Sequence, residues 1–247
     1  MGGSRVRVLM RGLIGALLPV QCAGCRAWDE VLCPSCRSLA AGPAHVASID
    51  GARGPLPLVA MGDYNGPLRR IVLAAKHSAR TDVTGFLDEA GARLGTALGG
   101  VLGLAGSPAD AVGVPTGRAP STGSAVDVWV VPAPSSWKRR LRGRQVALPL
   151  ARAVARALAA GVRPGVRVRV VDAVRLRVGA SSQSGKAGAQ RTVGRMGSMR
   201  ALAVPGPGVF VVAVDDVVTT GATVREMERV LGGLDAVATL CRPGLIS

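Results

Sequence analysis

Apolar positions recur with a helical spacing in the first half of the chain. Within residues 56–102 they lie three or four positions apart, as in Leu68, Ile71 and Val72 and again in Phe86 and Leu94. This spacing predicts that the segment is helical and contains two helices, each with one apolar face.

From residue 127 onward the pattern changes to short Val-rich runs that alternate with helical segments. The predicted strands are 128–131, 166–174, 209–214 and 236–240, and the predicted helices are 146–159 and 223–231. Such an alternation is typical of a parallel sheet that helices cover on both faces. We therefore predict an α/β fold for this part of the chain.

Residues 103–126 separate the two patterns. The segment (GLAGSPADAVGVPTGRAPSTGSAV) is rich in Gly, Ala, Pro and Ser and shows no periodicity. This composition predicts a flexible insertion that carries no chemistry.

Composition bounds the class of protein. The chain has 247 residues, of which 48% are hydrophobic and only 2% aromatic, so its core is expected to consist of Val, Leu and Ala. The longest uncharged run, 94–109, contains five glycines and a proline and is shorter than the ~20 apolar residues of a membrane-spanning helix. The sequence therefore predicts no membrane span.

The N-terminal residues share two features with an export signal. Arg5, Arg7 and Arg11 precede a short apolar stretch, 13–20, as they would in a signal peptide. Pro19 closes this stretch and no small-residue cleavage site follows it. We therefore expect a cytoplasmic protein, in which thiols stay reduced.

Four of the five cysteines form a regular pattern. Cys22, Cys25, Cys33 and Cys36 make two CxxC pairs separated by seven residues. Each pair can direct two sulfurs at one ion, and two pairs complete a tetrahedral four-thiolate site with no open position. The spacing predicts a structural zinc ion, with a redox pair or an iron–sulfur cluster as alternatives. Cys241 lies at the end of the last predicted strand and is expected to be a plain buried residue.

The sharpest chemical feature is the segment 209–223 (VFVVAVDDVVTTGAT). A hydrophobic strand ends in Asp215 and Asp216, and a turn of small and hydroxyl residues then opens a helix. Ligands of α/β proteins bind at the carboxyl ends of parallel strands. The backbone N–H groups of residues 219–222, at the start of this helix, suit a phosphate.

The side chains of this turn narrow the type of ligand. Thr220 and Thr223 offer hydroxyl donors, and Gly221 lets the backbone approach a ligand closely. The carboxylates of Asp215 and Asp216 would be repelled by a bare phosphate, so they require sugar hydroxyls or a metal ion as partners. The segment therefore predicts a sugar phosphate ligand.

Residues 214–223 resemble the phosphoribosyl pyrophosphate (PRPP) binding motif of type I phosphoribosyltransferases. The chain as a whole is similar to the ComF family, which couples an N-terminal four-cysteine zinc module to such a domain. The further matches are Tyr64, Pro67, Ile71, Lys76, residues 130–134 (VVPAP), Arg142, Gly143, Gln183 and Arg191. The resemblance implies a zinc-binding module at 12–45. It also implies a type I phosphoribosyltransferase-like parallel sheet flanked by helices at 55–247.

The resemblance also implies roles for individual residues. Asp215 and Asp216 would bind the two ribose hydroxyls. The loop 133–140 would face the pyrophosphate and its Mg²⁺, with Lys138 and Arg139 as candidate catalytic charges beside the two acids. The 5′-phosphate would lie on Thr219, Thr220, Gly221, Ala222 and Thr223. The implied activity is transfer of a phosphoribosyl group to a nitrogen base that the sequence does not identify.

The chain differs from the usual sequence pattern of the family at three places. These differences leave the PRPP motif intact and affect what the resemblance implies about the second substrate. Ala79 stands where the family usually has glycine, and Arg144 and Gln145 stand where an aromatic residue and asparagine are more common. The insertion at 103–126 is also unusual for the family.

Positive charge is concentrated between residues 138 and 200. This segment holds 16 of the 31 Lys and Arg residues and one acid, Asp172, in a chain of net charge +16. It is either a solubilising surface or an anion-binding face for polyphosphate or nucleic acid.

The basic segment suggests an alternative function. ComF proteins are associated with DNA uptake in competent bacteria, which implies a non-catalytic protein that binds single-stranded DNA and has a partner in the competence machinery. Aromatic residues, which stack on bases, are almost absent from the segment, and Trp137 alone borders it. Contacts to DNA would therefore be made to phosphates and would weaken steeply with salt.

Overall fold

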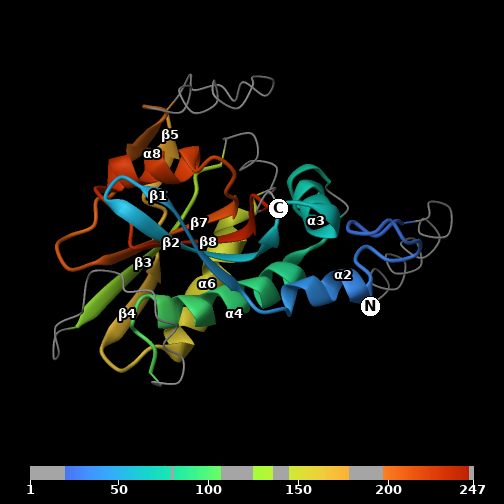
Figure 1. Cartoon of the computed structure of the whole chain (residues 1–247), viewed down its shortest axis with the longest axis horizontal. Coiled ribbons are helices and arrows are strands. Elements are labelled where there is room, and N and C mark those ends of the chain that lie inside the picture. Colours follow the sequence, from blue (N-terminus) through green and yellow to red (C-terminus); the bar gives the residue numbers. More distant parts are fainter. Residues whose placement is uncertain (1–19, 79–80, 107–124, 136–144, 178–196, 245–247) are drawn as a thin grey trace, which may run out of the picture.

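The computed structural model describes residues 20–78, 81–106, 125–135, 145–177 and 197–244, and a six-stranded sheet lies at its centre (Figure 1). The strand order is β1-β2-β8-β7-β3-β4. β1 is antiparallel to β2, and every other neighbouring pair is parallel. The strands are β1 His45–Gly51, β2 Gly54–Asp63, β3 Val126–Pro132, β4 Val166–Val170, β7 Phe210–Val217 and β8 Ala236–Arg242.

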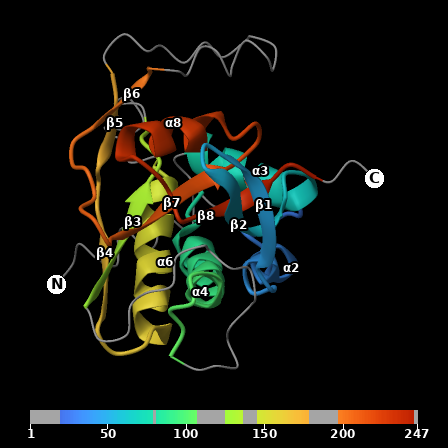
Figure 2. The same cartoon turned by 60° about the vertical axis from the view of Figure 1, so that its left-hand side comes forward.

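Helices cover both faces of this sheet (Figure 2). α4 (Thr84–Val101) and α6 (Ala147–Gly161) pack together on one face, and α8 (Ala222–Leu231) packs on the other. The side chains of β7 are apolar on both faces of the sheet. Val212 and Val214 belong to the hydrophobic cluster that contains α4 and α6, whereas Val211 and Ala213 belong to the cluster that contains α8. A strand buried on both faces is apolar at nearly every position. A small antiparallel pair, β5 (Val174–Leu176) and β6 (Met199–Ala201), lies beside α8.

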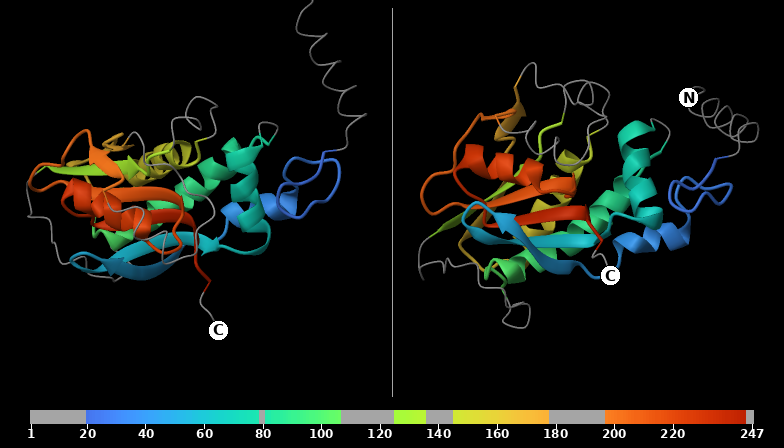
Figure 3. Two further views of the ribbon diagram at one scale, coloured as in Figure 1. Left: turned by 90° about the horizontal axis from the view of Figure 1, so that it is seen from above. Right: turned by 45° about the horizontal axis from the view of Figure 1, so that its top comes forward.

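The cysteine-rich segment lies at one end of the molecule, next to α3 (Gly66–His77) (Figure 3). It contains α2 (Pro34–Arg37) and the short 3-10 helix η1 (Ser38–Ala40). Cys22 and Cys36 belong to the same hydrophobic cluster as Leu68 and Ile71 of α3. The segment therefore shares the core of the α/β part.

Most predicted elements of the second half are confirmed. The α/β fold has a mostly parallel sheet flanked by helices, and the predicted helices at 146–159 and 223–231 correspond to α6 and α8. The predicted strands 128–131, 209–214 and 236–240 correspond to β3, β7 and β8.

Two predictions of secondary structure are wrong. Residues 56–63 belong to strand β2 and are not helical. Positions 56–61 of β2 are all buried, and a continuous apolar run has no period that separates a strand from a helix.

The predicted strand 166–174 is not one strand. β4 ends at Val170, and Val174 pairs with Ala201 in the second sheet after a turn at Asp172, which forms an ion pair with Arg175.

The predicted insertion at 103–126 is too wide at both ends. Leu104 is fully buried, and its carbonyl accepts the N–H of Arg163 at 3.0 Å. Gly106 donates to the Gly161 carbonyl at 2.9 Å. Residues 103–106 therefore pack against the end of α6, and Val126 already belongs to β3; residues 107–124 lie outside the described part. In the part that the structure describes, every helix is too short or too polar to cross a membrane.

Candidate functional site

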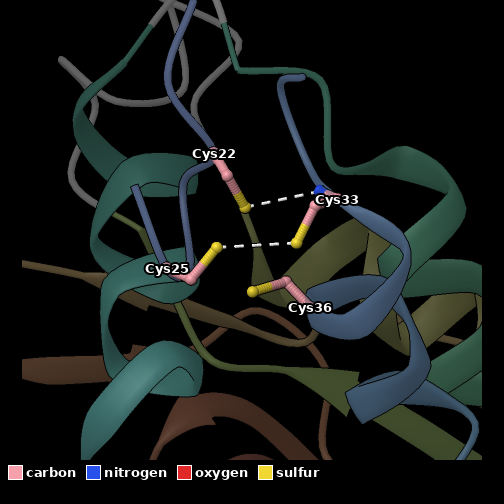
Figure 4. A group of neighbouring side chains, drawn as sticks. All are labelled: Cys22, Cys25, Cys33 and Cys36. Atoms are coloured by element: carbon pink, nitrogen blue, oxygen red, sulfur yellow. Dashed lines mark hydrogen bonds between the residues drawn. The ribbon is translucent and has the colours of Figure 1, made fainter. Parts of the chain in front are cut away.

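The four cysteines predicted to bind metal come together in the structure (Figure 4). The sulfurs of Cys22, Cys25, Cys33 and Cys36 all lie within 4.8 Å of one another, and those of Cys25 and Cys33 are 3.5 Å apart. Sulfurs bound to one tetrahedral zinc ion, at about 2.3 Å from it, are separated by about 3.8 Å. The cluster can therefore hold a structural metal ion, and four thiolates are one of the donor sets of structural zinc sites.

The backbone around the cluster favours a thiolate at Cys22. The N–H of Cys33 donates to the Cys22 sulfur at 3.3 Å. Burial by itself raises the pKa of the Cys22 thiol, but hydrogen bonds from the backbone of Cys33, Cys25 and Gly24 outweigh it and lower the pKa to about 6. Burial also raises the pKa of the Cys36 thiol well above its usual range. Because metals bind the thiolate, the backbone hydrogen bonds at Cys22 favour the form of this cysteine that binds a metal.

Gly24 sets how closely the first CxxC pair approaches the second. A Cβ atom at Gly24 would lie 2.5 Å from the Cys36 sulfur, which is too close for any side chain. The Gly24 carbonyl accepts a hydrogen bond from the Arg70 side chain of α3. The cluster is therefore attached to α3 through both the Arg70 hydrogen bond and the shared core.

The two acids of the predicted sugar-phosphate site lie at the end of β7. The strand runs to Val217, so Asp215 and Asp216 both belong to it. They are 9% and 8% exposed. The N–H of Asp216 donates to the Asp215 carboxylate at 2.8 Å, and the Asp216 carboxylate forms an ion pair with Lys76. Lys76 comes from the last turn of α3 and was no candidate site residue in the sequence, although it was one of the matches to the family.

The turn after β7 contains a left-handed glycine directly before a helix. Thr219 and Thr220 are exposed, and Gly221 has a φ of +70°, a left-handed conformation that favours glycine. Gly221 is the N-cap of α8 and has no side chain to bond the first N–H groups of the helix. Ala222 and Thr223 form the first helical turn. The helix predicted after this turn therefore begins at Ala222, directly after the left-handed glycine.

Arg225 is a second cation that sequence reasoning missed. Its guanidinium folds back over the turn and donates to the Thr220 carbonyl at 2.6 Å. A Cβ atom at Gly221 would lie 3.1 Å from the Arg225 Nη1 atom. The charge of Arg225 therefore lies beside the turn, where it adds to the positive end of the helix dipole.

The carboxyl ends of three parallel strands meet beside these acids. Asp63 of β2 lies opposite Arg242 of β8, and their side chains form an ion pair at 3.2 Å. Val217 of β7 lies opposite Cys241. Cys241 is fully buried, as predicted, and burial raises the pKa of its thiol to about 12. This edge of the sheet therefore carries the Asp63–Arg242 ion pair, and the neighbouring Cys241 is fully buried.

Several predicted site residues lie outside the described part of the chain. They include the two candidate catalytic cations, Lys138 and Arg139, and the family matches Arg142, Gly143, Gln183 and Arg191. The start of their loop is described: Ala133 follows β3 and donates to the Val214 carbonyl at 2.7 Å. This bond holds the beginning of the 133–140 loop against β7, the strand that carries the two acids.

Acids from outside the basic segment neutralise part of its charge. Arg167 and Arg169 on edge strand β4 both pair with Asp127 of β3, at 3.1 and 3.2 Å. Arg156 of α6 pairs with Asp88 of α4 at 2.6 Å. The local excess of charge is therefore smaller than the sequence count of 138–200 suggests, although the side chains of Arg167 and Arg169 remain 66% and 60% exposed.

Comparison with known proteins does not identify a family. No model of a known protein family matches the chain, and no curated protein matches its sequence.

Proposed function

We propose that this protein is a ComF-like phosphoribosyltransferase-domain protein. It would bind PRPP, or another ribose 5-phosphate group, with Mg²⁺ and transfer the phosphoribosyl group to a nitrogen base. The observation that carries the proposal is the end of β7, where two nearly buried acids precede a left-handed glycine and the first turn of α8. Acids for the sugar and N–H groups for the phosphate then follow one another along a single strand, turn and helix.

In this proposal each part of the turn binds one part of the ligand. Asp215 and Asp216 accept hydrogen bonds from the two ribose hydroxyls. The backbone N–H groups and hydroxyls of residues 219–223 bind the 5′-phosphate, supported by the helix dipole. Arg225 adds a positive charge at the same end. Binding at both ends of the sugar fixes the position of C1.

The transfer step needs positioning and charge more than covalent help from the protein. The bond from C1 to the pyrophosphate oxygen breaks as a nitrogen of the base forms its bond to C1, and the electron pair of the broken bond leaves on pyrophosphate. Mg²⁺ would neutralise charge on the leaving pyrophosphate, and oxygen ligands such as the Asp215 and Asp216 carboxylates are the type it prefers. Lys138 and Arg139 would supply positive charge from the loop after β3.

The cysteine segment would be structural in this proposal. A closed four-thiolate site leaves no position for a substrate, so the metal would hold residues 12–45 in shape beside the transferase domain at 55–247. The shared core of Cys22, Cys36 and Ile71 supports a fixed attachment of the module to the domain.

The test is an assay of the purified protein with PRPP, Mg²⁺ and a panel of nitrogen bases, which follows the release of pyrophosphate. Release that depends on one base supports the transferase. Saturable PRPP binding with no release under any base would restrict the function to phosphoribosyl binding.

Single-stranded DNA binding is a second candidate function, and the exposed arginines of β4 favour it. Arg167 and Arg169 lie on the edge strand of the sheet with more than half of each side chain exposed. Because both already pair with Asp127, contacts to DNA phosphates would have to displace or share these pairs. Filter binding over a series of salt concentrations tests the idea, since phosphate contacts release counterions and give a steep dependence. A flat dependence would contradict it.

A further inference from the structure

A cation from another part of the fold reaches the acidic end of β7. Lys76, in the last turn of α3, forms an ion pair with Asp216, and the two side chains are only 20% and 11% exposed. Two adjacent carboxylates that are this buried repel each other and lose hydration. The Lys76 ammonium compensates part of that charge, and the pair is screened by solvent much less than an ion pair at the surface.

A bound ribose would change the surroundings of this ammonium. The proposed function makes the Asp216 carboxylate an acceptor for a ribose hydroxyl, so the hydroxyl and the ammonium would have to share it. An ammonium has three donors and can bond more than one acceptor. A hydroxyl is neutral and offers the Lys76 ammonium no opposite charge. A negatively charged group next to that hydroxyl would offer one.

The two ribose hydroxyls that the acids accept lie on neighbouring carbons, and the carbon next to the 2-hydroxyl is C1. In PRPP this carbon carries a pyrophosphate, whereas in ribose 5-phosphate it carries a hydroxyl. We propose that Lys76 binds the anionic group on C1 and thereby makes the site select PRPP over ribose 5-phosphate. This inference rests on the proposed function and adds to it a residue that lies outside the 214–223 motif.

The expected effect differs between the two ligands. Lys76→Met removes one charge-assisted hydrogen bond to the pyrophosphate, so the affinity for PRPP should fall on the order of 10- to 100-fold. The affinity for ribose 5-phosphate should change by no more than about 3-fold, because its C1 hydroxyl makes only a neutral contact with the ammonium. Lys76→Arg keeps the charge and should keep the preference for PRPP.

The experiment is calorimetric titration of both ligands, at one Mg²⁺ concentration, into the wild-type chain and the variants. Arg69→Met is the matched control, because Arg69 is an exposed cation of the same helix whose guanidinium lies over the Tyr64 ring. It should leave both affinities unchanged. A melting curve of each variant separates loss of binding from loss of fold.

A selective loss of PRPP affinity in Lys76→Met, restored in Lys76→Arg, supports the inference. An equal loss for both ligands, or no loss for either, would overturn it and leave Lys76 as a structural partner of Asp216. If Lys76→Met does not fold, Lys76→Arg decides alone, since a folded variant without any preference for PRPP would also overturn the inference. Failure of the wild-type chain to bind either ligand would instead refute the proposed function.

Discussion

Replacing Asp215 and Asp216 by asparagine separates the ligand-binding role of these acids from their structural role. In the wild-type chain the N–H of Asp216 donates to the Asp215 carboxylate at 2.8 Å. Asparagine has the shape of aspartate and keeps a carbonyl oxygen, so the side chain in Asp215→Asn can still accept this hydrogen bond. Its effect on the free energy of unfolding should be small. Asp216→Asn removes the charge that faces Lys76 and leaves an ammonium that is 20% exposed beside a neutral amide. We expect that change to destabilise the fold by about 1–3 kcal/mol.

The expected effect on the free energy of PRPP binding is similar for the two residues. A hydrogen bond from a ribose hydroxyl to a carboxylate contributes roughly 1.5–3 kcal/mol. The double variant should therefore lose on the order of 3–6 kcal/mol of binding free energy, which is two to four decades in affinity. Asp215→Asn is the most informative single change, because binding should weaken while stability stays nearly constant.

The assay combines calorimetric titration of PRPP with Mg²⁺ and urea unfolding of each variant. If the acids only support the fold, stability should fall and the ligand affinity of the folded protein should not. Undiminished PRPP affinity in a well-folded double variant would refute the assignment of these acids to the ribose.

Three further predictions concern the metal and the basic segment. Metal analysis should find about one zinc ion per chain, and Cys33→Ser should lower both zinc content and solubility; iron, or no metal, would be the contrary result. Gly24→Ala should weaken zinc retention against a chelator, because its Cβ would lie 2.5 Å from the Cys36 sulfur, whereas Gly42→Ala, with its closest contact at 3.8 Å, should not. Equal retention in the two variants would show that this approach is not needed. Replacing four arginines together should weaken DNA binding uniformly across sequences, and an unchanged filter-binding curve would count against the basic face. The four are Arg139, Arg140, Arg142 and Arg144.

The features that the sequence predicted well are those coded by neighbouring residues. The spacing of the four cysteines is local, and their sulfurs converge as the spacing requires. The strand, turn and helix around Gly221 are also local, because a buried apolar run, a left-handed glycine and an amphipathic helix follow one another directly. Each of these elements could be placed to within a few residues.

The features that the sequence did not reveal depend on burial or on distant contacts. The sequence of β2 does not distinguish a strand from a helix, because six consecutive buried positions show no alternation of apolar and polar residues. Lys76 meets Asp216 only because α3 follows β2, whose carboxyl end lies beside that of β8, the neighbour of β7. The charge count of 138–200 missed Asp127 and Asp88, which reach this segment through the sheet and the α4–α6 contact. Contacts of this kind follow from topology and cannot be read from spacing.

The central claim is that the turn after β7 binds PRPP, and the most direct measurement is a calorimetric titration of PRPP with Mg²⁺ into the wild-type chain. The account predicts saturable binding at one site per chain, competed by ribose 5-phosphate and lost in the Asp215→Asn and Asp216→Asn double variant. Absence of saturable binding to the folded, zinc-loaded protein, or binding that the double variant retains in full, would contradict it.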